Sequence, residues 1–487
     1  MPEIDSLPAP KLRDGLGTAH IDLGVQDDSL QMWFDQGLNM LHGFWHIEAF
    51  RAFSEVIRRD SIQAMAWWGI AMCQPGFGGD YSRPFVEAAQ KAQKYKTQQP
   101  KKYQDLIDAS AILVTEGIAN AQGPFRTLYQ TYPDDAEIVA YSAIILRMHE
   151  DETTQQEVKK LLEANIKKHP NHTGLLHYYI HVMETRPAEY MQAIDEAEQL
   201  IRLAPNSPHM VHMAGHLYFI AGDYDRALDV FHRCLDIEEA WHTGENIPKV
   251  HNQNYIHNLH FIALCYSELD EKEKALEYAT LYERTTYRIG QPRSGGTMML
   301  LYEGRILPAL VHIRYGEYKK AAERLHYWIH SLDFPLDHPV VRPYLQAMYH
   351  YAMGMDAVMR QDRETAIQSG REMTMAFQTF EQQAMSRQQD IEFKTINDTH
   401  DIINMARYEL AGWIDNMDTS QPYNDAAWAK AIDLADAIKY DEPPRLMYPI
   451  EESLARLHLY RGDKTLMQKA KEKALLHRPK SKMILKM

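Results

Sequence analysis

The sequence predicts an all-α protein in which antiparallel helical hairpins stack into one continuous solenoid. Apolar residues recur at intervals of three and four through segments such as AEIVAYSAIILRM and YDRALDVFHRCL, and almost no stretch alternates with the period of two that strands show. Pro133, Pro170 and Pro205 are spaced 37 and 35 residues apart, and each separates one apolar pattern from the next. A period of about 34 residues is typical of repeated two-helix units.

Residues 208–231 carry the packing pattern of such a unit most completely. The residues that make it up are Pro208, Gly215, Tyr218, Gly222, Tyr224, Ala227 and Phe231. Position by position, this segment resembles the tetratricopeptide repeat family, and the resemblance implies a right-handed α-solenoid. The physical chemistry agrees with it, because Gly215 and Ala227 allow two helices to approach closely and Gly222 allows the chain to reverse.

Most of residues 30–470 resembles a histidine-rich group of bacterial tetratricopeptide proteins to which no settled reaction is attached. The motifs are FWHIEAFRAF, AMAWWGIAMC, LLHYYIHVMET, HMVHMAGHLY, YIHNLHFIA and EPPRLMYPIEESL. We expect a lead segment over 1–29, N-terminal hairpins over 30–133, central repeats with the histidines over 134–290, and degenerate hairpins over 291–487.

Composition excludes several classes of partner. A net charge of -15 argues against nucleic acid, whose binding requires basic surface. We expect no contact with a membrane, because no run approaches 18 apolar residues and the start MPEIDSLPAPKLRDG lacks the features of a signal peptide. Three widely spaced cysteines fit a reducing cytoplasm better than a disulfide framework. The oligomeric state stays open.

Histidine is concentrated in the central repeats, where 12 of the 24 fall between His169 and His260. Helices that begin at Thr173, Pro208 and Ile256 would carry seven of them at positions 2, 5 and 9. These seven are His177, His181, His209, His212, His216, His257 and His260. The three positions share one helical face. The resemblance implies that this face lines the concave groove in which ligands bind.

Seven imidazoles aimed at one region predict a transition-metal centre. Copper is favoured by ligand type, and iron or zinc are alternatives. Glu184 follows His177 and His181 on the same helical stripe, which makes it a candidate metal ligand or general base. Because seven imidazoles exceed the needs of one ion, either two ions are held or some histidines orient others or bind substrate.

These patterns leave several functions open. The first is a copper- or iron-dependent oxidoreductase that admits a small molecule or a peptide to the groove. The alternatives are a non-catalytic peptide-binding scaffold, a zinc-dependent hydrolase, and metal storage or delivery. We expect His42 and His46, near a hairpin turn, to be structural. Glu239, His242 and His251 are weaker candidates for the site.

Overall fold

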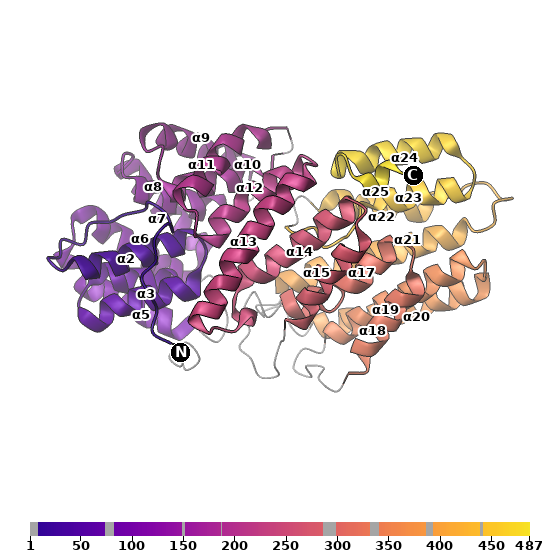
Figure 1. The fold of residues 1–487 in the computed structure, drawn as a ribbon, viewed down its shortest axis with the longest axis horizontal. Helices are drawn as coiled ribbons and strands as arrows, with labels where there is room; N and C mark the ends of the chain where they lie inside the picture. Colours follow the sequence, from indigo (N-terminus) through magenta and orange to yellow (C-terminus); the bar gives the residue numbers. More distant parts are fainter. Residues whose placement is uncertain are drawn as a thin grey trace. The chain divides into compact units, whose positions relative to one another are not determined.

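The computed structural model describes residues 8–73, 82–148, 151–186, 188–285, 299–331, 340–385, 393–438 and 442–487. Within these ranges the chain is helical and contains no strand (Figure 1). Helices that follow each other in the sequence pack against each other as antiparallel hairpins, so the predicted all-α fold of tetratricopeptide-like hairpins is confirmed. None of the described helices combines the length and apolar character needed to cross a membrane.

Contacts divide the chain into two compact units. The first comprises the described residues up to Tyr218 together with Asp229–Asn254. The second comprises Phe219–Leu228 and the described residues from Tyr255 onward. The division of one solenoid into segments 1–29, 30–133, 134–290 and 291–487 stays a prediction.

The helices divide between the units as follows, with α12, α13 and α14 contributing residues to both. The first unit contains α2 Asp28–His42, α3 His46–Arg59, α4 Ala64–Met72, α5 Ser82–Tyr95, η3 Lys96–Gln98, α6 Lys101–Glu116, α7 Ile118–Thr131, α8 Ala136–Arg147, α9 Glu152–Lys168, α10 Thr173–Met183, η4 Tyr190–Ala193, α11 Ile194–Leu203, α12 Pro208–Ile220, α13 Tyr224–Glu245 and η5 Lys249–His251. The second contains α14 Gln253–Glu268, α15 Lys272–Arg284, η6 Leu300–Gly304, α17 Leu307–Arg314, α18 Tyr318–Ile329, α19 Val341–Met359, α20 Arg363–Met385, α21 Phe393–Asp415, α22 Ala426–Ala437, α23 Ile450–Tyr460, α24 Lys464–His477 and α25 Lys482–Leu485.

Helix α2 packs against α10 as well as against α3 and α4. The segment before α2 forms hydrogen bonds with both helices. Asn39 of α2 exchanges two hydrogen bonds with the backbone of Ala19, and Thr18 N donates to Thr173 Oγ1 of α10 at 3.2 Å. The C-terminal end of α2 and the turn after it are therefore brought to the middle of α10. This return of the chain places the candidate site in the interior of the first unit.

Glycines mark the closest helix contacts. A Cβ added at Gly215 of α12 would lie 2.3 Å from a ring carbon of Phe231 in α13, so only glycine fits there. Phe53 of α3 fills the same kind of space against Gly37 of α2 and Gly69 of α4. The turn between α12 and α13 contains Gly222 with a φ of +71°, a conformation that favours glycine. The predicted roles of Gly215 and Gly222 are thus confirmed.

Candidate metal centre

Helix α10 carries two of the predicted histidines and is buried along its whole length. It begins after His172, whose Nδ1 accepts a hydrogen bond from the backbone N–H of Leu175 and so caps the helix. Apolar side chains on all faces are typical of a core helix. His177 and His181 are 0% and 6% exposed, so they lie inside the protein and do not line an open groove.

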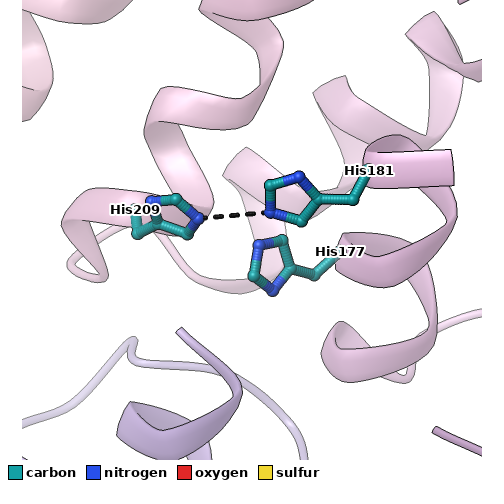
Figure 2. Close-up of side chains that lie close together, drawn as sticks. All are labelled: His177, His181 and His209. Atoms are coloured by element: carbon teal, nitrogen blue, oxygen red, sulfur yellow. Dashed lines mark hydrogen bonds between the residues drawn. The ribbon is translucent and has the colours of Figure 1, made fainter. Parts of the chain in front are cut away.

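His177 and His181 of α10 point toward His209, which projects from α12 (Figure 2). One ring nitrogen from each of the three lies within 4.8 Å of the others. The Nε2 atoms of His181 and His209 are 3.5 Å apart. Metal–nitrogen bonds of about 2.0–2.1 Å in a tetrahedral shell separate ligand nitrogens by about 3.3 Å. The His181–His209 pair is thus close to the spacing of one ion's ligands, and we call the group of His177, His181 and His209 the histidine triad.

Hydrogen bonds at Nδ1 determine which nitrogen of each ring carries the proton. His177 Nδ1 lies 2.7 Å from the backbone carbonyl oxygen of His42, which can only accept, so Nδ1 is the donor. His181 Nδ1 donates likewise to Glu184 Oε1 at 2.6 Å. In the neutral form of each ring the lone pair is therefore on Nε2. Metal-binding histidines typically have this arrangement, with the second nitrogen held by a carbonyl or carboxylate.

His177 is kept neutral by its surroundings. Burial, together with neighbouring His181 and His209, lowers its pKa well below the usual value. Its Nε2 is buried and has no hydrogen-bond partner within the described part of the chain. A buried nitrogen with a lone pair and no partner is costly in an apo protein, and a metal ion would satisfy it.

Glu184 follows the last residue of α10, and both of its oxygens are occupied. Oε1 accepts from His181, and Oε2 accepts from His216 Nδ1 at 2.8 Å. The side chain is fully buried, and Arg147 Nη2 lies 3.6 Å from Oε1. The sequence suggested Glu184 as a metal ligand or general base. That role stays a prediction. In the structure, Glu184 holds two imidazoles by their Nδ1 atoms, as a positioning residue does.

The turn between α2 and α3 covers the histidine triad. Phe44, with a φ of +53°, lies with its ring centroid 4.8, 5.6 and 5.2 Å from those of His177, His181 and His209. His46 stacks on Phe44 at 6.0 Å, and burial lowers its pKa to about 4. An apolar cover of this kind limits the access of water to the ring nitrogens. Sequence analysis did not identify Phe44.

In a second histidine cluster of this unit, every ring nitrogen has a hydrogen-bond partner within the protein. Glu137 accepts from His42 Nε2 and His172 Nε2, both at 2.8 Å. His42 Nδ1 meets the Tyr178 hydroxyl at 2.9 Å, and His172 Nδ1 is used as the helix cap. Burial works against the charge of Glu137, yet His172 and His42 hold its pKa well below the usual value. Since every ring nitrogen here has a partner, we interpret this cluster as structural.

The register of the repeats contained a signal for this cluster. Glu137 lies four residues after Pro133, as His209 lies four residues after Pro205. Both therefore occupy position 2 of a first helix. Extending the register back by one repeat would have placed a carboxylate on the face that carries the histidines.

The remaining two of the seven, His257 and His260, belong to the second unit. There His257 Nε2 is 3.3 Å from Glu442 Oε1, and His260 Nδ1 is 3.2 Å from Glu303 Oε2. The first unit thus holds five of the seven predicted ligands.

The weaker candidates are built into local structure. Both ring nitrogens of His242 are engaged, one with the carbonyl oxygen of Ile247 at 2.8 Å and one with the side-chain amide of Asn252 at 3.1 Å. Glu239 forms an ion pair with Lys249. The side chain of His251 lies outside the described residues.

Comparisons with known proteins give distant structural likenesses. No family model matches the sequence, and no curated protein matches it. The human IFIT1 dimer with m7Gppp-AAAA is 13% identical, with a TM-score of 0.39 over 85% of this chain and 92% of that chain. The human IFIT1 dimer with PPP-AAAA is 14% identical, with a TM-score of 0.38 over 93% and 92%. Yeast Tom70 is 11% identical, with a TM-score of 0.35 over 95% and 94%.

Proposed function

We propose that the first unit binds a transition-metal ion through His177, His181 and His209, and that the protein is a copper-dependent oxidoreductase. The observation that carries this proposal is the pattern of hydrogen bonds at Nδ1 of His177 and His181. His177 and His181 each donate a hydrogen bond from Nδ1–H to a fixed acceptor. The Nε2 lone pairs of both rings therefore face the third imidazole. Rings fixed in this orientation are ready to bind an ion in the space between them.

The donor set favours copper or zinc over iron. Non-haem iron centres commonly use two histidines and one carboxylate. Glu184 is the carboxylate nearest to the triad in sequence, and its oxygens are committed to Nδ1 atoms of two histidines. Zinc-dependent hydrolysis would need a free general base beside the metal-bound water, and Glu184 does not supply one. An all-imidazole set therefore supports copper.

Three protein ligands leave one coordination position for a small molecule. Copper bound there would supply one-electron redox chemistry toward a co-substrate such as dioxygen. The chain's own contribution is to orient three rings and to exclude water, because Phe44 covers them and all three are buried. Burial favours a small-molecule substrate over a peptide.

Elemental analysis of protein purified without a histidine tag tests the proposal. We expect stoichiometric copper in the wild type and its loss in His177→Ala, His181→Ala and His209→Ala. His172→Asn is the matched control, because it removes an imidazole that is only 10% exposed from the same unit and keeps a side chain that caps α10. This control should retain the metal.

Oxygen uptake with ascorbate as electron donor then tests the redox reaction. We expect uptake that requires copper and disappears in His181→Ala. A wild-type chain that neither purifies with copper nor takes it up by dialysis contradicts the proposal and leaves a helical scaffold. Stoichiometric copper without uptake of oxygen contradicts the oxidoreductase and indicates storage or delivery.

A further inference from the structure

We propose that His212 and His216 form a second metal position, and that Glu184 controls both positions through one imidazole of each. The inference rests on the proposed function, because it extends the metal centre of the first unit from one ion to two. Its starting point is a single buried carboxylate with one oxygen on each side: Oε1 holds His181 of the triad, and Oε2 holds His216.

His212 and His216 are built as a chelating pair. They are four residues apart on α12, so their rings project from one face of the helix. Both side chains are 1% exposed, and their Nε2 atoms lie 2.6 Å apart. The ring planes are nearly perpendicular, and Phe231 packs against His212 with centroids 4.7 Å apart. At this distance the two nitrogens share a hydrogen-bonded proton, and an ion that replaced this proton would need them to move apart to about 3.3 Å.

Glu184 determines which nitrogen of His216 is available. A carboxylate only accepts, so His216 Nδ1 carries the proton and Nε2 carries the lone pair in the neutral ring. His181 is constrained in the same way by the other oxygen. One residue therefore prepares a ligand nitrogen at each of the two positions.

Glu184→Gln separates this model from a merely structural role. A glutamine amide has nearly the same shape, but it offers one acceptor and one donor. The amide oxygen can hold only one of His181 and His216 in its present form. The other ring must accept from the amide nitrogen at Nδ1, so its proton moves to Nε2 and blocks ligation. The variant should therefore lose one metal position and keep the other.

The test is a titration of metal-free protein with Zn²⁺, which is redox-inert, followed by elemental analysis after dialysis. We expect two ions per chain in the wild type and in the control His172→Asn. His212→Ala, His216→Ala and Glu184→Gln should each bind one. Nitrogen-15 chemical shifts of the wild-type imidazoles test the role of Glu184 without a substitution, because they show which nitrogen of His181 and His216 is protonated.

The outcomes distinguish the inference from the proposal beneath it. One ion per chain in the wild type, unchanged in His212→Ala, overturns the second position and leaves the triad intact. Two ions in Glu184→Gln, or a proton on Nε2 of His181 or His216 in the wild type, overturns the role of Glu184. Absence of binding in the wild type contradicts the proposed function and this inference with it. If Glu184→Gln does not fold, the two histidine variants and the nitrogen-15 shifts still decide.

Discussion

His172 caps α10 and His177 lies five residues later, in the middle of the helix, yet their ring nitrogens meet different partners. His172 uses Nδ1 to cap the helix and Nε2 to reach Glu137. His177 donates a hydrogen bond from Nδ1 to a carbonyl oxygen, and its buried Nε2 has no hydrogen-bond partner among the described residues. At the residue scale, this difference in hydrogen bonding separates a structural histidine from a candidate ligand. The spacing of histidines in the sequence does not predict this difference in hydrogen bonding.

Glu137→Gln tests that distinction. We expect the substitution to lower the free energy of unfolding by about 1–3 kcal/mol, since an amide cannot accept from both His42 and His172. Metal content should not change. Denaturant unfolding followed by circular dichroism, together with elemental analysis, measures both quantities.

The effect of Glu137→Gln should depend on pH in a defined direction. A carboxyl with a pKa lowered by folding stabilises the protein above its unfolded pKa of about 4.5, and this contribution is lost as the pH falls toward the folded value. The difference from the wild type should therefore be largest near pH 7 and shrink below about pH 4. A loss of metal at pH 7 in a folded variant would contradict the structural interpretation of this cluster.

At the scale of the helix, the hairpin of α12 and α13 depends on the absence of a side chain at Gly215. We expect Gly215→Ala to reduce the free energy of unfolding by about 1–3 kcal/mol, because its Cβ would overlap with the buried ring of Phe231. The matched control is Gly123→Ala in α7, where an added Cβ meets nothing within 4 Å. It should be neutral or stabilising by up to about 1 kcal/mol. Equal thermal shifts in the two variants would contradict this account of the packing.

The register of the repeats predicted the helices well and the site only in part. α10 and α12 begin at Thr173 and Pro208, as the proline spacing predicted, whereas α14 begins at Gln253, three residues before the predicted Ile256. Periodicity is local, so it identifies which face of each helix carries histidine. It could not predict that α2 returns to α10, since that contact joins residues such as His42 and His177 that are 135 positions apart.

At the scale of the whole molecule, the predicted set of seven histidines is divided between two compact units. A repeat pattern treats all hairpins alike and contains no information on where contacts become sparse. Each unit also holds a buried acid whose pKa depends on folding. In the first, folding lowers the pKa of Glu137. In the second, burial raises the pKa of Glu409 to about 7. A rise in pH should therefore act on the stability contributions of these two carboxyl groups in opposite directions.

Glu409 lies in α21, where its carboxyl group accepts from the Tyr448 hydroxyl at 3.2 Å. Desolvation outweighs this hydrogen bond, so the folded chain binds the proton more tightly than the unfolded chain does. The sign follows from linkage: stability is greatest below the unfolded pKa of about 4.5 and falls as the pH rises toward 7. The loss amounts to about 3 kcal/mol at most.

Glu409→Gln should remove this dependence, because the amide imitates the protonated carboxyl group and still accepts from Tyr448. We expect the variant to match the wild type at pH 4 and to be more stable by about 1–3 kcal/mol at pH 8, as measured by denaturant unfolding. Asp401→Asn on the same helix is the control, since that side chain is 47% exposed and should give a small difference at either pH. The difference in the free energy of unfolding between Glu409→Gln and the wild type should grow from pH 4 to pH 8. If it does not grow, the carboxyl group of Glu409 has the same pKa in the folded and unfolded chains, and this account is wrong.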